Sequence, residues 1–346
     1  MPRVAVVTSS PPLVEGGHLV IARSLVQALA SEGYESGLVV TPQNRFGRQA
    51  SAYLATWLTD VGVTGEDRPI HHVISLRYPS YAVRHRSHVC WLNHTMREYY
   101  DQWDRFSAPL SWKGRIKERT RRSLIHLADR RLLGRVKRLF VQSRTIAARI
   151  DRWCGLPSEV LYPPAPQRAY RCEAYGDYLF AISRLTPLKR IDLLVESLSE
   201  PEARGIRCVI AGDGEERQPL QRLIEQRGLA ARVQLLGRVS DAELVDHLAR
   251  CRAVCFPPFD EDYGFVTIEA FSSGKPVITC RDSGGAAELV AHEATGLVAE
   301  PSPSSLAPML RRLMDDAALA ERMGKAAAEV AAGITWSDTV RKLVPD

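Results

Sequence analysis

The feature that most constrains the fold is an alternation of short apolar runs with helical patterns, which begins at the N-terminus and restarts in the second half. The β-branched run RVAVVTS predicts a buried strand, and the loop SPPLVEGG and a helical pattern that stops at Gly33 follow it. The run ESGLVVTP predicts the next strand. Strand, glycine loop, helix and strand in this order predict an α/β unit with a parallel sheet.

The alternation breaks once, at the proline-rich stretch LYPPAPQRAYRCEAYGDY, whose middle lies near residue 168. A chain of 346 residues is too long for one ordinary core, so two domains are expected. We predict Rossmann-like, doubly wound α/β domains over 1–168 and 169–330, and a last helix within 331–346 that packs back on the first domain. Ligands bind beyond the C-terminal strand ends of such sheets, so two domains that face each other predict an interdomain cleft.

Further strands and helices are expected on both sides of this break. In the first half, strands are predicted at HHVISL, HVCWLNH and RLFVQS, with a long basic helix over about 112–135. In the second half, strands are predicted at YLFAIS, RCVIAG, VQLLG, AVCFPP and PVITC, with helices between them. Two closing helices are expected over about 303–314 and 317–332.

The charge of the chain is unevenly distributed. Residues 1–168 hold 25 Lys and Arg against 13 Asp and Glu, whereas the remaining residues hold 21 against 27. Of the basic residues, 14 fall between Lys113 and Arg152. This excess predicts a polyanionic partner or an anionic membrane surface for the first half. A solvated, arginine-rich helix face is the bland alternative, and nucleic-acid binding through 113–152 is a distant one.

Composition limits the compartment and the cofactors. The hydrophobic share of 45% is that of a globular protein, and no apolar run approaches the roughly 18 residues of a membrane span. The N-terminal apolar run is too short for a secretory signal and predicts a strand instead. We therefore expect a cytoplasmic protein, and peripheral attachment to the inner face of the membrane stays an open alternative. His247, Cys251 and Cys255 have helical spacing, but the run AVCF predicts a buried strand, so we predict that these residues hold no metal. We also expect no metal elsewhere and no cofactor.

Polar residues follow the predicted strands of the second half. Arg184 stands at the end of the first of these strands, and Lys189 stands at the start of the next helix. Two cations beside helix amides are a pocket for phosphate, although surface cations are common. The stretches AGDGEE (211–216) and DSGGAAE (282–288) place glycine turns after later strands, where backbone can approach a ligand or other backbone.

The stretch FDEDYGFVTIEAFSSGKPVI brings two glutamates to one predicted helix. Glu261 precedes this helix, Gly264 and Phe265 begin it, and Glu269 lies inside it. First-turn amides lack partners within the helix and can hold an anion such as a diphosphate. The two carboxylates can accept hydrogen bonds from diols, as in a sugar and a ribose. A helix cap with a solvated face is the alternative interpretation of this spacing.

Together, the stretches SRLTPLKRIDLLVESL, AGDGEE, EDYGFVTIEAFSSGKPVI and DSGGAAELVAHEATGLV resemble the donor domain of retaining glycosyltransferases of family 4, which have the two-domain GT-B fold. The family's motif of Glu, seven residues and Glu is matched by Glu261 and Glu269. The resemblance implies that Arg184 and Lys189 neutralise the diphosphate of a UDP- or GDP-linked sugar. It implies that Glu261 binds the sugar hydroxyls and that Glu269 binds the ribose.

The resemblance also assigns backbone and first-half positions. It implies that amides around Gly264 and Phe265 hold sugar and phosphate, and that LLGRVS (235–240) contacts the base. Gly16 and Gly17 correspond to the family's first glycine loop, near the diphosphate and the sugar. The segment CWLNHTMREYYDQW resembles a His-Thr-Pro-Met-Arg-like run without its proline, which places His94 on the histidine that lines the sugar or acceptor site.

The activity implied by the resemblance is hexosyl transfer with retention, from a nucleoside diphosphate sugar to a glycan or lipid-linked acceptor, in envelope polysaccharide or glycolipid assembly. It also implies that Asp260 and Asp262, which imitate an Asp-x-Asp metal motif around Glu261, lie at the donor sugar without a metal. A GT-B epimerase or phosphorylase acting on related sugars is the alternative. An NAD-dependent Rossmann enzyme is disfavoured, because EGGHLVIARS is not a Gly-x-Gly-x-x-Gly run.

Overall fold

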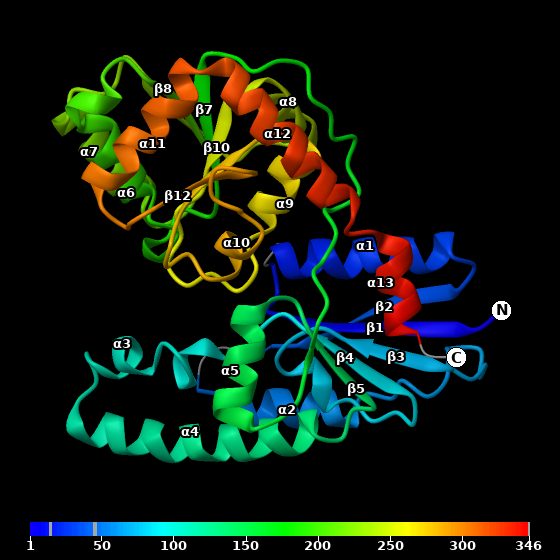
Figure 1. The fold of residues 1–346 in the computed structure, drawn as a ribbon. Coiled ribbons are helices and arrows are strands. Elements are labelled where there is room, and N and C mark those ends of the chain that lie inside the picture. Colours follow the sequence, from blue (N-terminus) through cyan, green and yellow to red (C-terminus); the bar gives the residue numbers. More distant parts are fainter. Residues whose placement is uncertain (14–15, 44–46, 345–346) are drawn as a thin grey trace. The chain divides into compact units, whose positions relative to one another are not determined.

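The computed structural model describes residues 1–13, 16–43 and 47–344, and the chain forms two compact units. Unit 1 contains Met1–Pro163 together with the C-terminal segment from Trp336, and unit 2 contains Pro164–Thr335. Each unit is a parallel sheet with helices packed on it (Figure 1). Arg168 lies in unit 2, and its side chain is paired with Glu269 of the same unit.

Unit 1 is built on a six-stranded sheet of order β2-β1-β3-β4-β5-β6, in which every pair is parallel. The strand order reverses between β1 and β3, so ligands are expected at the loops after these strands. The strands are β1 (Arg3–Ser10), β2 (Glu35–Pro42), β3 (His72–Ser75), β4 (His88–Leu92), β5 (Arg138–Val141) and β6 (Glu159–Val160). The helices are α1 (Gly17–Ser31), α2 (Gln49–Leu58), α3 (Trp103–Ser107), α4 (Trp112–Leu133) and α5 (Arg144–Cys154), with 3-10 turns at Ser80–Ala82 and Arg97–Tyr99.

The last helix, α13 (Trp336–Leu343), belongs to unit 1. The ring of Trp336 lies edge-on to the fully buried ring of Trp91, with centroids 6.3 Å apart. At the other end of α13, Lys342 is 3.4 Å from Glu159, the first residue of β6. This helix is shorter than the predicted segment 331–346. The first two residues of that segment belong to the end of the preceding helix, and Pro345 and Asp346 lie outside the described residues.

Unit 2 has the strand order β12-β11-β10-β7-β8-β9, again wholly parallel. The order reverses between β7 and β10, which makes their carboxyl ends the expected ligand position. The strands are β7 (Tyr178–Ile182), β8 (Arg207–Ala211), β9 (Val233–Gly237), β10 (Ala253–Cys255), β11 (Val277–Cys280) and β12 (Gly296–Ala299). The helices are α6 (Ile191–Ser199), α7 (Arg217–Gln226), α8 (Asp241–Arg250), α9 (Phe265–Ser272), α10 (Gly285–Glu288), α11 (Pro303–Asp315) and α12 (Ala317–Ala332), with 3-10 turns at Pro187–Lys189 and Pro201–Ala203.

The predicted alternation is confirmed in both units, and the structure adds helices that it did not show. The main additions are α2 and α5, which lie on unit 1. The helical pattern of α2 is weak, because its large apolar residues Leu54, Trp57 and Leu58 are exposed, and no side chain caps its start within the described part of the chain. Unlike α2, α5 has a side-chain cap: the Ser143 hydroxyl accepts from the Ile146 amide at 3.1 Å.

His247, Cys251 and Cys255 are packing residues. The imidazole of His247 stacks on Phe180 with centroids 5.1 Å apart, and both cysteines are fully buried. Burial raises the pKa of the Cys251 thiol to about 12, so this cysteine is neutral at ordinary pH. The two cysteines therefore act as small apolar core residues of unit 2.

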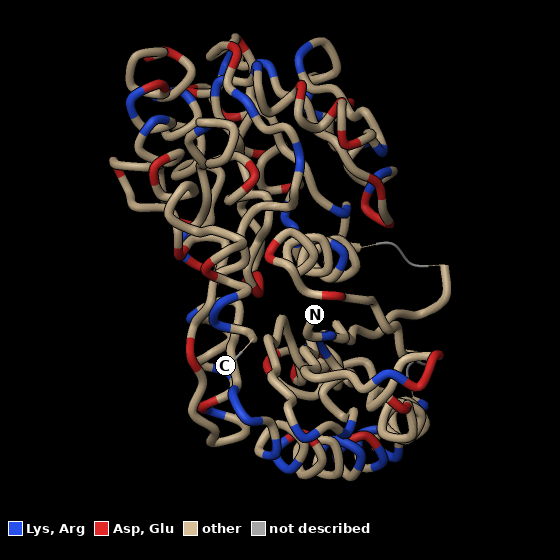
Figure 2. Tube along the Cα trace, turned by 90° about the vertical axis from the view of Figure 1, so that its right-hand side faces the viewer, with Lys and Arg blue, Asp and Glu red and all other residues tan. Residues whose placement is uncertain are grey.

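The basic excess of the first half is concentrated on α4 and its neighbours. Lys and Arg outnumber Asp and Glu along the lowest part of Figure 2, where this helix lies. The exposed large apolar residues of the chain include Trp112, Ile116, Leu124 and Leu127, which are all on α4. None of the described helices combines the length and apolar character that crossing a membrane requires.

Candidate functional site

The predicted donor-site residues of unit 2 follow β7 and β10, the two strands between which the sheet order reverses. Arg184 and Lys189 lie on the loop after β7, and Glu261 lies on the loop after β10. The Phe259 amide donates to the Leu188 carbonyl at 2.8 Å and joins the two loops. The topology thus brings together residues that are more than seventy positions apart.

Lys189 and Glu261 form an ion pair at this position. The Lys189 ammonium donates to Oε2 of Glu261 at 2.5 Å, and the side chains are 22% and 19% exposed. The ammonium also lies 5.6 Å from the ring centre of Phe256. Arg184, on the same loop, is exposed. The two loops therefore present cations and a carboxylate together, as a ligand with both phosphate and hydroxyl groups requires.

Arg190, which sequence reasoning did not select, fixes these loops. Its guanidinium donates to the carbonyls of Pro257 and Pro258 at 2.8 and 2.7 Å, and to both carboxylate oxygens of Asp282 at 2.8 and 2.7 Å. These partners follow β10 and β11, so one side chain ties three strand ends together. Next to Lys189 in the sequence, Arg190 gives no local sign of this role, because the role depends on distant acceptors.

The DSGG turn holds the backbone on which Glu261 stands. The Glu261 amide donates to the Ser283 carbonyl at 3.1 Å, and the Gly285 amide donates to the Glu261 carbonyl at 2.8 Å. A Cβ on Gly285 would lie 2.2 Å from the Asp262 carbonyl oxygen, so only glycine permits this approach. The AGDGEE turn requires glycine for the same reason, because a Cβ on Gly212 would lie 1.8 Å from the Ser183 carbonyl oxygen.

The start of α9 comes directly after the Glu261 loop. Gly264 is its N-cap residue with φ of +79°, and a Cβ there would lie 2.7 Å from that of Ala286. Within the described residues no side chain caps this helix; the Thr267 amide donates to the Gly264 carbonyl at 3.0 Å, and the amides before it are left for solvent or a ligand. Phe265 begins the helix, and its ring meets that of Tyr263 edge-on at 5.2 Å.

Glu269 lies in a separate network on the same helix. The residue is 7% exposed, and its carboxylate accepts hydrogen bonds from the Arg168 guanidinium and, at 3.1 Å, from the Tyr170 hydroxyl. Arg168 also pairs with Asp241 at 2.9 Å. Burial raises the pKa of the Glu269 carboxyl, and the charge of Arg168 opposes that shift. Arg168 and Tyr170 escaped sequence reasoning, because their proline-rich stretch has no periodic pattern.

The predicted first-half positions lie at the carboxyl edge of the unit 1 sheet. Gly16 is the N-cap residue of α1 and Gly17 is its first residue, after β1, whereas Val14 and Glu15 of the predicted loop lie outside the described residues. His94 follows β4, and its Nδ1 is 2.7 Å from the Thr95 carbonyl oxygen.

Known proteins share both the sequence of unit 2 and the fold of the chain. Residues 174–330 match the family described as Glycosyl transferases group 1. The alpha-D-kanosaminyltransferase of Streptomyces kanamyceticus is 29% identical over 241 residues, which are 66% of this chain and 61% of that protein. A D-inositol 3-phosphate glycosyltransferase of Nocardia farcinica is 34% identical over 198 residues, which are 53% of this chain and 44% of that protein. The chain thus spans less than two thirds of the length of each of these relatives.

Among solved structures, HepE of Anabaena in complex with UDP and glucose is similar over 98% of this chain and 97% of its own, with a TM-score of 0.71. Its sequence is 18% identical, so this likeness concerns the fold alone. Two six-stranded parallel sheets with covering helices are the architecture of the GT-B fold, which confirms the predicted fold class. The family match assigns residues 174–330 of unit 2 to the group 1 glycosyl transferases, as the motifs of this unit predicted, and the chain as a whole has the GT-B fold.

Proposed function

We propose that the protein is a retaining glycosyltransferase that moves a hexosyl group from a nucleoside diphosphate sugar to an acceptor hydroxyl. The observation that carries this proposal is the Lys189–Glu261 pair at the strand reversal of unit 2. Doubly wound sheets bind their ligands at this position, and the pair offers a cation for phosphate beside an acceptor for hydroxyls.

The donor roles divide among three elements of unit 2. Arg184 and Lys189 neutralise the diphosphate, and the amides around Gly264 and Phe265 add hydrogen bonds to sugar and phosphate. Glu261 accepts from the hydroxyls of the transferred sugar. The uncapped start of α9 and the ion pair at 2.5 Å support these roles.

Glu269 is assigned to the ribose hydroxyls. Its ion pair with Arg168 favours the ionised carboxylate in spite of burial, and an ionised carboxylate accepts hydrogen bonds without donating. The strand β9 and the turn after it, residues 235–240, are assigned to the base.

The transfer breaks the bond between the anomeric carbon and the diphosphate oxygen and forms a bond to the acceptor oxygen on the same face. The acceptor proton passes to the departing phosphate. Charge builds on the diphosphate in the oxocarbenium-like transition state, and Lys189 and Arg184 stabilise it there. The proposal needs no metal. In unit 1, it assigns His94 to the sugar or acceptor and Gly16 and Gly17 to the diphosphate.

The identity of donor and acceptor is proposed from the relatives. UDP is the first nucleotide to test, because HepE was solved in complex with it, and GDP is the alternative. The name of the Nocardia relative specifies a phosphate-bearing acceptor, which suits the basic first half, so an envelope glycan or glycolipid intermediate is proposed. No observation favours an epimerase, a phosphorylase or a nucleic-acid-binding protein.

We extend the proposal to peripheral attachment at an anionic membrane. The helix α4 carries Lys113, Arg115 and Arg119 together with the exposed apolar residues Trp112 and Ile116. Basic helices with exposed apolar residues bind anionic lipid surfaces. Sedimentation with anionic and neutral vesicles tests this extension, and absence of binding to anionic vesicles at low salt contradicts it.

The central test is binding of nucleoside diphosphates measured by thermal shift with UDP, GDP, ADP and NAD. A ligand at about 100 times its dissociation constant adds about 2.7 kcal/mol to stability, which raises Tm by several degrees.

Lys189→Ala and Glu269→Ala are expected to lower turnover by at least about 100-fold. Lys325→Ala, which changes a 72% exposed lysine of unit 2, serves as the control. Near-normal turnover in either site variant would contradict the role proposed for that residue in the donor site.

A further inference from the structure

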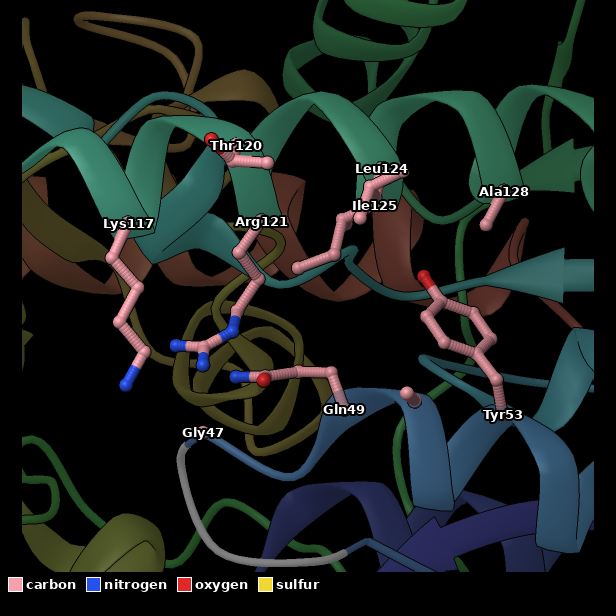
Figure 3. A pocket seen from close by; sticks show the side chains of 10 residues that line it. Gly47, Gln49, Tyr53, Lys117, Thr120, Arg121, Leu124, Ile125 and Ala128 are labelled. Atoms are coloured by element: carbon pink, nitrogen blue, oxygen red, sulfur yellow. The ribbon is translucent and has the colours of Figure 1, made fainter.

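A pocket of about 440 Å³ lies on unit 1, between α2 and α4, and none of the proposed donor or acceptor roles uses it. One wall is the start of α2 with Gly47, and the other is the α4 face from Lys117 to Ala128 (Figure 3). The start of α2 follows β2, at the carboxyl edge of the sheet. The pocket runs along about 16 Å of α4, given the rise of an α-helix per residue.

The end of the pocket near Gly47 is polar and cationic. Lys117 and Arg121 point from α4 toward the first turn of α2 in Figure 3. The guanidinium of Arg121 donates to Glu118, whose other oxygen accepts from the Tyr99 hydroxyl at 2.7 Å. The start of α2 has no side-chain cap among the described residues. A lysine ammonium, a guanidinium and a helix N-terminus together favour an anionic group.

The side chain of Gln49 supplies a second, independent sign of a ligand. Gln49 is 4% exposed, and its Oε1 has no hydrogen-bond partner in the part of the chain that the structure describes. Its Nε2 is directed to the Tyr99 hydroxyl at 3.3 Å. Figure 3 shows the amide below Arg121, between the two helices. A buried acceptor without a donor is uncommon, so the ligand is expected to bring a hydroxyl or a P–OH group.

The opposite end of the pocket is apolar. Leu124, Ile125 and Ala128 line it from α4, and the ring of Tyr53 lines it from α2 (Figure 3). The Tyr53 hydroxyl donates to Asp129, so the apolar ring is the part of Tyr53 that lines the pocket. Leu124 is 63% exposed, so this end of the pocket is open to solvent and can take a longer chain. Polar and apolar groups are thus separated along one axis.

The walls of the pocket are held together by a buried carboxylate. Asp129 of α4 accepts from the hydroxyl of Tyr53 on α2, and also from those of Tyr81 and Tyr100. Asp129 is fully buried, so these bonds fix α4 against α2. The pocket is therefore formed before a ligand arrives, which lowers the entropy cost of binding.

We propose that this pocket binds a lipid phosphate, with the phosphate monoester at Lys117 and Arg121 and the hydrocarbon chain along Leu124 and Ile125. The P–OH of the monoester monoanion donates to Gln49. Charge complementarity at one end and apolar lining at the other argue for one amphiphilic ligand. The inference deepens the proposed function by giving the acceptor a lipid phosphate group in addition to the hydroxyl that receives the sugar. It rests on that function only for the transfer step, and binding itself is independent of it.

The test is calorimetric binding of geranyl phosphate, below its critical micelle concentration, to the full chain. Geraniol and inorganic phosphate are the probes that lack one of the two parts. Geranyl phosphate is expected to bind at least about tenfold more tightly than either, because only it uses both ends of the pocket. Lys117→Glu and Leu124→Ser are each expected to weaken its binding by about tenfold or more.

Matched controls lie on the same helix. Arg131→Glu makes the same change of charge and Leu127→Ser removes a similarly exposed leucine, yet neither residue lines the pocket, so geranyl phosphate affinity is expected to change less than about threefold. Equal weakening by Lys117→Glu and Arg131→Glu would assign binding to the basic surface of α4 and overturn the pocket. Geraniol binding as tightly as its phosphate, or no binding of geranyl phosphate, overturns it as well.

The nucleotide titration separates this inference from the proposed function. Binding of geranyl phosphate without any response to nucleoside diphosphates leaves the pocket in place and contradicts the donor site. A response to a nucleoside diphosphate without geranyl phosphate binding keeps the donor site and removes the lipid-phosphate pocket. The two ligands test different units, so neither result depends on the other.

Discussion

Asp129 of unit 1 and Glu269 of unit 2 are both buried carboxylates on helices, but they are stabilised in different ways. Asp129 accepts hydrogen bonds from three tyrosine hydroxyls, which are neutral donors. Glu269 accepts from one tyrosine hydroxyl and is paired with the Arg168 guanidinium. Burial raises the pKa of Asp129 to about 6, in spite of its hydroxyl donors. Burial also raises the pKa of Glu269, but a cation opposes the shift there.

The difference separates a structural carboxylate from one that can serve a ligand. Neutral donors do not offset the cost of burying the charge of Asp129. Its hydrogen bonds come from three segments of unit 1 and hold these segments together. A cation beside Glu269 favours a charged acceptor at neutral pH, as hydroxyl binding requires. Burial alone therefore does not distinguish the structural role of Asp129 from the ligand-binding role proposed for Glu269, whereas the charge of the partner differs between them.

The largest expected effect is the loss of the cation beside Glu269. Arg168→Leu leaves a buried carboxylate unpaired and is expected to cost about 3–5 kcal/mol of the unfolding free energy of unit 2. Arg171→Leu is the control, because Arg171 is 41% exposed and its ion pairs lie at the surface. That variant is expected to leave the unfolding free energy nearly unchanged, because exposed ion pairs are screened by solvent. Denaturant unfolding measures both, and equal costs would contradict the contrast.

The next effect is the pH dependence of unit 1. The pKa of Asp129 is raised from 3.8 to about 6, so between these values the folded unit binds more protons than the unfolded chain. Its contribution to stability is therefore fully present below the unfolded pKa and is lost as pH rises through 6, by up to about 3 kcal/mol. Asp129→Asn should flatten this slope. Unfolding of the two proteins at pH 4.5, 5.5 and 7 measures it, and an unchanged slope would show that other groups dominate.

Two left-handed glycines, one in each unit, give a smaller effect. Gly264 of unit 2 has φ of +79° and a Cβ there would meet Ala286, whereas Gly33 of unit 1 has φ of +87° with nothing within 4 Å. Gly33→Ala is expected to cost about 1 kcal/mol from backbone strain alone. Gly264→Ala adds a steric clash and should cost roughly 2–3 kcal/mol, with weaker nucleotide binding. Similar costs at the two positions would show that the loop around Gly264 can yield.

The smallest effect compares single hydroxyls. Tyr53→Phe removes one of three neutral donors to Asp129 and is expected to cost about 1.5 kcal/mol. Tyr170→Phe leaves Arg168 on Glu269 and should cost about 0.5–1 kcal/mol. Measured unfolding free energies decide the order. A larger loss at Tyr170 would mean that the guanidinium contributes less than its charge suggests.

Reading the chain was enough to predict the order of strands and helices, the break between two α/β halves, and the turns that carry Lys189, Glu261 and Gly264. These features are local: hydrophobic period, glycine turns and helix starts depend on neighbours within a few residues. The Glu-pair motif was equally readable, because its two positions lie on one turn and one helix.

Tertiary structure alone decided which residues meet. It set the reversal between β7 and β10, and so paired Lys189 with Glu261. It placed Arg168 on Glu269, 101 positions away, and Tyr53 on Asp129, 76 positions away. It also placed the start of α2 beside α4 and so formed the pocket of unit 1. Such pairings depend on how sheets and helices pack, and no local pattern along the chain records which distant side chain a buried charge will meet.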